Sequence, residues 1–163
     1  MPDMFGVCQW LEQSSLGSEV RDSFWLFPLI ETVHLFGIVV LVGATSTLDL
    51  RLLGLALRRE PVSKLARQML GWTWAAFSVM VVTGFLMFSS EATRCWENSA
   101  FRLKMAMLLV AGLNALIFHT TSYRRLQQWD SSAHTPTGAK VAGVFSVLLW
   151  FGIVAAGRWI AFV

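Results

Sequence analysis

The stretch FWLFPLIETVHLFGIVVLVGATSTLDLRLLG, residues 24–54, decides the fold class of this chain. Its apolar run is long enough to cross a bilayer as a helix, which takes about 20 residues for about 30 Å of hydrocarbon. It nevertheless contains Glu31 and His34, which stand about one helical turn apart. Because unpaired polar groups are costly in lipid, the stretch predicts a transmembrane helix whose carboxylate and imidazole have partners or a function.

The rest of the chain has the same apolar character. Of its 163 residues, 55% are hydrophobic and only 14% are charged, whereas a soluble domain carries about 25% charged residues. The apolar residues form four continuous blocks, which predict helices because only helices and closed barrels satisfy their backbone in lipid. We expect an all-α protein with one integral membrane domain, residues 1–163, and spans at roughly 24–48, 70–88, 101–122 and 141–163.

The charged residues predict an orientation. Lys and Arg are concentrated between spans one and two and between spans three and four. Loops rich in Lys and Arg usually face the cytoplasm, so both termini are expected on the opposite side. Residues 4–11 have apolar side chains at helical spacing and predict a short amphipathic helix on that outer surface, where Cys8 and Cys95 also fall. The basic residues flank spans and form no stripe, so we expect no nucleic-acid partner.

Short connections predict an up-down-up-down four-helix bundle, in which each residue adds about 1.5 Å of depth. Glu31, Lys104 and Arg158 come out at one level, about 26–27 Å from the inner edge of their spans. His34 lies about one turn deeper. We therefore predict an ion pair between Glu31 and Arg158, which forms a polar lid over His34. Asn114 is expected to hydrogen-bond across helices.

The other two histidines fall elsewhere. His119 lies about 5 Å from the inner edge, so its depth differs from that of His34 by roughly 17 Å. This difference disfavours one haem held by both histidines. His134 stands in the polar segment DSSAHTPTG and is expected to be a solvated loop residue.

Several stretches resemble those of a known family: WLFPLIETVHLFG, TLDLRLLGL, WTWAAFSVMVVTG, NSAFRLKM, AGLNALIFH and AAGRWIAF. On these motifs the chain resembles a family of small, uncharacterised bacterial four-helix inner-membrane proteins, over nearly its whole length. The resemblance implies a bacterial inner-membrane location and the topology described above. It implies no reaction, because the family has no established activity.

The first functional hypothesis is a small membrane subunit that binds b-type haem, or a metal, for electron transfer. His34 would be an axial ligand and Met107 its partner, because imidazole and thioether groups both ligate haem iron. Lys104 and Arg158 would hold the propionates at the outer mouth, and His119 remains a further candidate ligand. In the alternative, the chain is a non-catalytic accessory or assembly subunit of a larger membrane complex, and its ionisable residues only fix helix register. A proton relay is a third hypothesis, since intramembrane Glu and His serve such paths.

Overall fold

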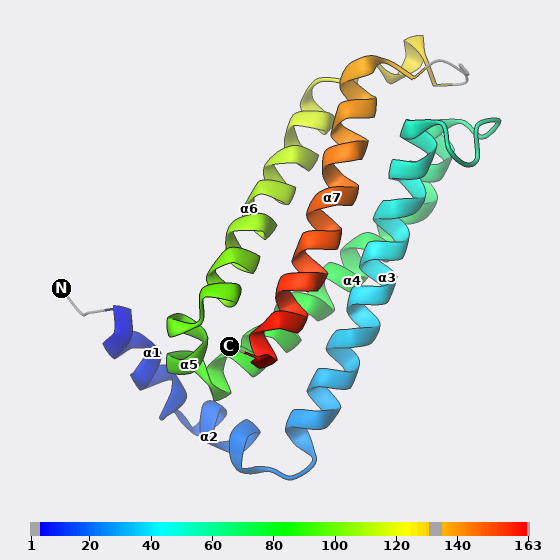
Figure 1. The fold of residues 1–163 in the computed structure, drawn as a ribbon. Coiled ribbons are helices and arrows are strands. Elements are labelled where there is room, and N and C mark those ends of the chain that lie inside the picture. Colours follow the sequence, from blue (N-terminus) through cyan, green and yellow to red (C-terminus); the bar gives the residue numbers. More distant parts are fainter. Residues whose placement is uncertain (1–3, 131–134, 163) are drawn as a thin grey trace.

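The computed structural model describes residues 4–130 and 135–162 of the chain, and every regular element in these ranges is helical. Figure 1 shows long helices with shorter ones at their ends. In chain order the elements are α1 (Met4–Glu12), α2 (Ser15–Asp22), α3 (Leu26–Leu53), α4 (Val62–Ser90), α5 (Ala92–Glu97), α6 (Ser99–Thr120), η1 (Tyr123–Gln128), α7 (Thr137–Trp159) and η2 (Ile160–Phe162).

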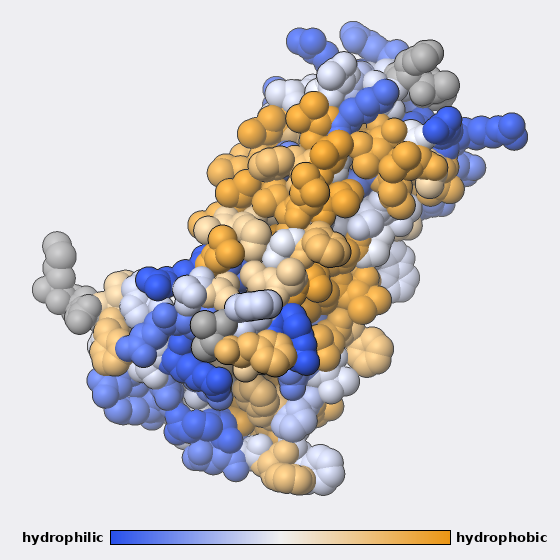
Figure 2. All heavy atoms as spheres, in the orientation of Figure 1, coloured by the Kyte–Doolittle hydropathy of each residue, from blue (hydrophilic) through white to orange (hydrophobic). Residues whose placement is uncertain are grey.

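The four long helices α3, α4, α6 and α7 are the predicted spans. Each is long and apolar enough to cross a membrane. Figure 2 shows an apolar belt across the middle of the visible face, with hydrophilic residues at both ends. Such a belt fits a lipid bilayer, which has no water to hydrogen-bond exposed backbone. The chain is therefore a multi-pass membrane protein by the length and composition of its helices.

Two of the helices begin earlier than hydropathy predicts. Helix α4 starts at Val62, about two turns before the predicted span, because residues 62–69 continue it as an amphipathic segment. Val62 and Leu65 are buried in these turns while Lys64 and Arg67 are exposed. Helix α7 likewise starts at Thr137 rather than near residue 141. Helix α3 ends at Gly54, whose backbone takes the left-handed conformation (φ 71°) that glycine adopts without strain.

The four spans pack against each other as an all-α four-helix bundle, as predicted. Helix α3 lies against α4 on one side and α7 on the other, and α6 lies against α7. We call these three contacts the α3–α4, α3–α7 and α6–α7 seams. Between α4 and α6, the rings of Phe88 and Phe101 stack with centroids 5.5 Å apart.

One end of the bundle, the termini end, carries a cap of short helices (Figure 1). The predicted N-terminal helix is confirmed as α1, which packs against α5, while α2 packs against α4 and α3. Cys8 is the buried residue of α1, whereas Trp10 on the same helix is 70% exposed. Helices α2 and α5 were not predicted, because segments of eight and six residues are too short to show a clear apolar period.

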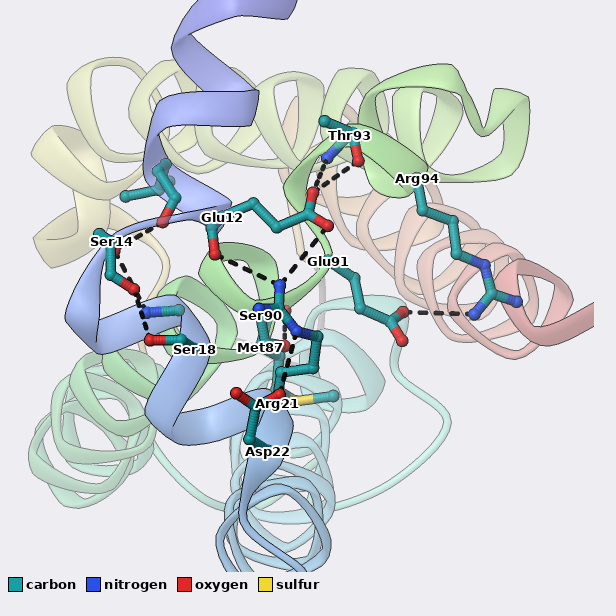
Figure 3. Close-up of polar contacts among 12 residues, drawn as sticks. Glu12, Ser14, Ser18, Arg21, Asp22, Met87, Ser90, Glu91, Thr93 and Arg94 are labelled. Carbon is teal, nitrogen blue, oxygen red and sulfur yellow. Dashed lines mark hydrogen bonds and ion pairs between the residues drawn. The ribbon is translucent and has the colours of Figure 1, made fainter.

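Glu12 fastens this cap to the bundle (Figure 3). Its Oε2 accepts hydrogen bonds from the Thr93 backbone N–H at 2.9 Å and from the Thr93 hydroxyl at 2.5 Å. These two bonds and the nearby charge of Arg21 hold the pKa of Glu12 below its usual value. Arg21 also donates to the Glu12 backbone oxygen at 3.3 Å. The α1–α2 corner is thus attached to α5.

Gly17 lets α2 approach the end of α4 closely. A side-chain carbon built onto Gly17 would lie 2.6 Å from the Ser89 backbone oxygen, closer than real contacts allow. On α1, by contrast, a carbon built onto Gly6 would have no atom within 4 Å. The two glycines therefore form a matched pair, in which one is required by packing and the other is not.

We expect Gly17→Ala to lower the stability of the cap by about 1–3 kcal/mol, the usual effect of overpacking. Thermal unfolding of the purified protein in detergent measures this change. Gly6→Ala is the control and should leave the unfolding temperature unchanged or slightly raised, because alanine favours helix. Equal effects of the two substitutions would contradict the close approach of α2 to α4.

Candidate functional site

His34 lies on the buried stripe of α3, together with Ile30, Gly37, Leu41 and Ala44. These positions recur at helical spacing on one face, so the stripe faces other helices rather than lipid. The His34 side chain is 8% exposed. A histidine buried at this depth in an apolar belt needs a partner for its ring N–H.

The hydrogen bonds of Thr83 define which nitrogen of His34 carries a proton. The Thr83 hydroxyl donates its one hydrogen to the Val79 backbone oxygen, at 2.6 Å. His34 Nδ1 lies 2.7 Å from the same Thr83 Oγ1. Because that hydroxyl hydrogen is already used, Nδ1–H must donate to Thr83. In neutral His34, Nε2 therefore keeps a free lone pair, and no described residue hydrogen-bonds it.

Glycines on each helix of the α3–α4 seam receive a side chain from the other helix. A carbon built onto Gly84 would lie 3.3 Å from His34 Cε1, and one built onto Gly37 would lie 3.1 Å from Met80 Sδ. Gly37 follows His34 by one turn on α3, and Met80 precedes Gly84 by one turn on α4. The imidazole and the thioether of Met80 thus occupy neighbouring positions in one seam.

The α6–α7 seam holds two further candidates from the sequence. A carbon built onto Gly152 would lie 2.9 Å from Met107 Sδ, and one built onto Gly157 would lie 3.6 Å from Lys104 Nζ. Both side chains are half-buried on α6 and point toward α7. Met107, the predicted partner of His34, lies in a different seam from it.

The structure does not form the predicted Glu31–Arg158 ion pair. Both side chains are exposed, and no ion pair within residues 4–130 and 135–162 joins them. Arg158 instead places its guanidinium carbon 5.3 Å from the centroid of the Phe162 ring. The polar lid predicted above His34 is therefore not present in this arrangement.

The reason is the register of the α3–α7 seam. The Ser146 hydroxyl donates to Asp49 Oδ2 at 2.6 Å, so these two residues share a level. Arg158 lies twelve residues from Ser146 along α7, and Gly37 lies twelve residues from Asp49 along α3, so Arg158 and Gly37 share a level. Glu31 lies six residues beyond Gly37, about 9 Å closer to the termini end than Arg158. The depths estimated from the sequence take the inner end of span one, next to Asp49, as level with the start of span four at Val141, which is five residues from Ser146.

The histidines stay apart, as the depth estimate indicated. His119 is exposed near the end of α6 and stacks on Tyr123, with ring centroids 4.8 Å apart and planes at 14°. It lies at the opposite end of the bundle from the cap, which we call the loop end. His134 lies outside the described residues. The structure thus does not bring His119 to His34.

Residues 4–130 and 135–162 form no cluster of the usual metal-binding side chains. No three His, Cys, Asp or Glu side chains gather around one point in the described residues. Two hollows of about 290 and 440 Å³ lie at the termini end, on either side of Thr93 and Glu97, and His34 lines neither.

Cys8 and Cys95 are free thiols. Burial is the main cause that raises the pKa of Cys95, to about 11. That thiol is protonated at neutral pH and is a poor nucleophile.

Sequence analysis missed Thr83 and treated Asp49 only as a span edge. Asp49 is 6% exposed and is bonded by Ser146, another residue that was not singled out. Hydroxyl residues in apolar helices are common, so neither Thr83 nor Ser146 stands out by composition. The one usable signal was that each is a small polar residue at the depth of an ionisable residue on an adjacent span. Asn114 was predicted correctly, since its Nδ2 donates to the Ala142 backbone oxygen at 3.1 Å.

We expect Thr83→Val to destabilise the bundle by about 1–3 kcal/mol, because it keeps the shape of the side chain but leaves the His34 Nδ1–H without an acceptor. Thermal unfolding in detergent measures the change. Thr32→Val is the control, since its hydroxyl bonds only the Pro28 oxygen of its own helix, on the exposed face. A Thr83→Val protein as stable as Thr32→Val would show that the His34–Thr83 bond contributes little.

Comparison with known proteins gives one match. No curated protein and no solved structure is similar to the chain. Residues 7–163 match the family described as "Family of unknown function (DUF6644)". This match confirms the resemblance to an uncharacterised family that the sequence motifs indicated. The chain belongs to the DUF6644 family.

Proposed function

We propose that this protein is a small membrane redox subunit in which His34 would bind a b-type haem through Nε2. The observation that carries the proposal is the hydrogen-bond chain from His34 Nδ1–H to Thr83 and on to Val79. Histidines that ligate metals nearly always donate their other ring N–H to a protein oxygen, which fixes the tautomer and aims the free nitrogen. His34 meets this condition, because its Nδ1–H donates to the Thr83 hydroxyl oxygen.

The residues near His34 have side chains of the chemical types that bind haem. Met80 supplies a thioether in the same seam as His34, so it replaces Met107 as the favoured second ligand. Lys104 is a half-buried cation on α6, which suits an anionic propionate. Arg158 lies one residue beyond Gly157, which Lys104 contacts, and supplies a second cation at that level. His119 has no part in this site because it lies at the loop end.

A bound haem would supply one-electron transfer, and residues of the chain would orient the ligand and exclude water. Thr83 would hold the imidazole in one orientation and raise its basicity as a ligand through the Nδ1–H bond. Gly37 and Gly84 would hold the two helices close together, because each receives a side chain of the other helix, Met80 at Gly37 and His34 at Gly84. The surrounding apolar helices would keep water away from His34 Nε2.

We also propose that the protein lies in the bacterial inner membrane with both termini in the periplasm. The loop end carries eight Lys and Arg against three acidic residues, whereas the termini end carries five Lys and Arg against seven. This bias is typical of cytoplasmic loops. In that orientation His34 lies in the periplasmic half of the membrane.

Haem titration of the purified protein tests the proposed ligand. We expect a Soret band to develop on adding haem b, with one haem per chain, and His34→Ala to lose it. His119→Ala is the matched control and should bind haem like the unchanged protein, because His119 stacks on Tyr123 away from the site. Absence of a Soret band, or its persistence in His34→Ala, would overturn the haem proposal.

The alternative function is a non-catalytic accessory subunit, and the reciprocal glycine contacts favour it. Gly84 receives His34 and Gly37 receives Met80, which packs the α3–α4 seam without a cofactor. Under this alternative the chain binds no haem and copurifies with a larger membrane complex. The haem titration therefore separates the two functions.

Cysteine labelling in intact cells tests the orientation. The native thiols are poor probes, because Cys8 is buried and Cys95 is protonated and half-buried. We expect a membrane-impermeant thiol reagent to label Gln13→Cys, at the termini end, and not Gln128→Cys, at the loop end; both positions are exposed. Labelling of Gln128→Cys alone would reverse the orientation.

A further inference from the structure

Seven exposed basic side chains gather at the loop end. They come from two parts of the chain: the α3–α4 connection with the start of α4, and η1 with the start of α7. We call them the basic surface: Arg58, Arg59, Lys64, Arg67, Arg124, Arg125 and Lys140. The top of the molecule in Figure 2 shows hydrophilic side chains projecting beyond the apolar belt at this end.

The acidic residues at this end do not neutralise the basic surface. Glu60 is paired with Lys64 at 2.7 Å. Asp130 accepts hydrogen bonds from the Ser63 backbone N–H at 2.8 Å and from the Ser63 hydroxyl at 2.6 Å. Burial acts to raise the pKa of Asp130, but the bonds from Ser63 and Val62 and the charge of Arg51 hold it below its usual value. Asp49 is buried against Ser146.

Most of the basic surface therefore has no protein counter-charge. Arg59, Arg67, Arg124, Arg125 and Lys140 form no ion pair with any residue that the structure describes. Arg58 donates to the Gly54 backbone oxygen and has no carboxylate partner in that part of the chain. A cluster of like charges is unfavourable alone, so a bound anion would stabilise it.

The two parts of the basic surface are held in one piece. The Val62 backbone N–H donates to the Asp130 oxygen at 3.3 Å, which joins α4 to the end of η1. Arg51 donates from Nε to the Glu60 oxygen at 2.7 Å, which joins α3 to the connection. Beneath these bonds lies a buried apolar cluster formed by Leu52, Val62, Leu126, Trp129 and Ala139. The two backbone segments that carry the cations are therefore joined to one another.

The basic surface lies at the depth of lipid headgroups. Trp72 and Trp74 on α4 are 63% and 61% exposed, and exposed tryptophans of membrane proteins prefer the interface. Arg67 precedes Trp72 by five residues, about 7.5 Å further from the membrane centre. Headgroup phosphates lie just outside the hydrocarbon, which is where this spacing sets Arg67. A phosphate attached to a lipid is thus already at the right level.

We propose that the basic surface binds anionic phospholipid headgroups, with cations from both parts of the chain contributing to one site. Lys and Arg near an anionic membrane surface each favour binding by about fivefold. The Arg side chains suit phosphate oxygens because the planar guanidinium donates two parallel hydrogen bonds. This inference does not depend on the haem proposal or on which side of the membrane the loop end occupies.

Native mass spectrometry of the detergent-purified full chain tests the proposal, with equal amounts of phosphatidylglycerol and phosphatidylcholine added. We expect phosphatidylglycerol to be retained preferentially and the preference to weaken as ionic strength rises, since salt screens exposed charges. Arg67→Gln with Arg125→Gln, one cation from each part, should reduce the preference by at least about fivefold. Equal concentrations of inorganic phosphate should not displace the lipid, because free phosphate lacks the membrane anchor.

The matched control is Arg94→Gln with Arg102→Gln, which removes two exposed cations from the termini end. It should keep the full preference for phosphatidylglycerol. Equal retention of the two lipids by the unchanged protein would overturn the proposal whatever the variants do. So would an equal loss in the control and in the Arg67/Arg125 variant, or displacement by inorganic phosphate alone. Unfolding temperatures of all three proteins establish that each is folded.

Discussion

Polar side chains inside the apolar belt must find partners within the protein, because lipid offers none. In this chain each of the three seams meets that constraint with an interhelical polar bond. His34 and Thr83 join α3 to α4, Asp49 and Ser146 join α3 to α7, and Asn114 bonds the Ala142 oxygen between α6 and α7. Apolar packing alone tolerates sliding by a turn, whereas a hydrogen bond breaks when the helices shift. These bonds therefore set the register on which the glycine contacts and the candidate site depend.

The spans and the bundle could be predicted from the sequence, because hydropathy reports directly on burial in lipid. The relative heights of the helices could not. Hydropathy gives the depth of a residue within its own helix, and the amphipathic starts of α4 and α7 hide where those helices begin. The Glu31–Arg158 pair was predicted from such depths, whereas the structure places Ser146, and not Val141, beside Asp49 and forms no ion pair between Glu31 and Arg158 among the described residues. His34 was found because an ionisable residue in an apolar run is conspicuous, whereas Thr83 was missed because a threonine there is not.

His34 combines a packing role with an unused chemical capacity. Its contact with Gly84 explains why the ring is buried, and Thr83 explains why one nitrogen is satisfied. Neither contact involves Nε2. Sulfur and nitrogen donors on adjacent turns of one seam distinguish this region from the loop end. At the loop end Asp130 is bonded by Ser63 and Arg51 by the Glu60 backbone oxygen, while most of the basic surface has no protein counter-charge.

The seams also differ in how far apart their partners lie along the chain, which bears on the order of assembly. His34 and Thr83 belong to consecutive spans, and so do Asn114 and Ala142. Each of these bonds closes a hairpin of two neighbouring helices as soon as its second helix is in the bilayer. Asp49 and Ser146 are separated by 97 residues and join the first span to the last. During synthesis the Asp49–Ser146 bond therefore cannot form before α7 inserts, whereas the His34–Thr83 bond needs only the first two spans.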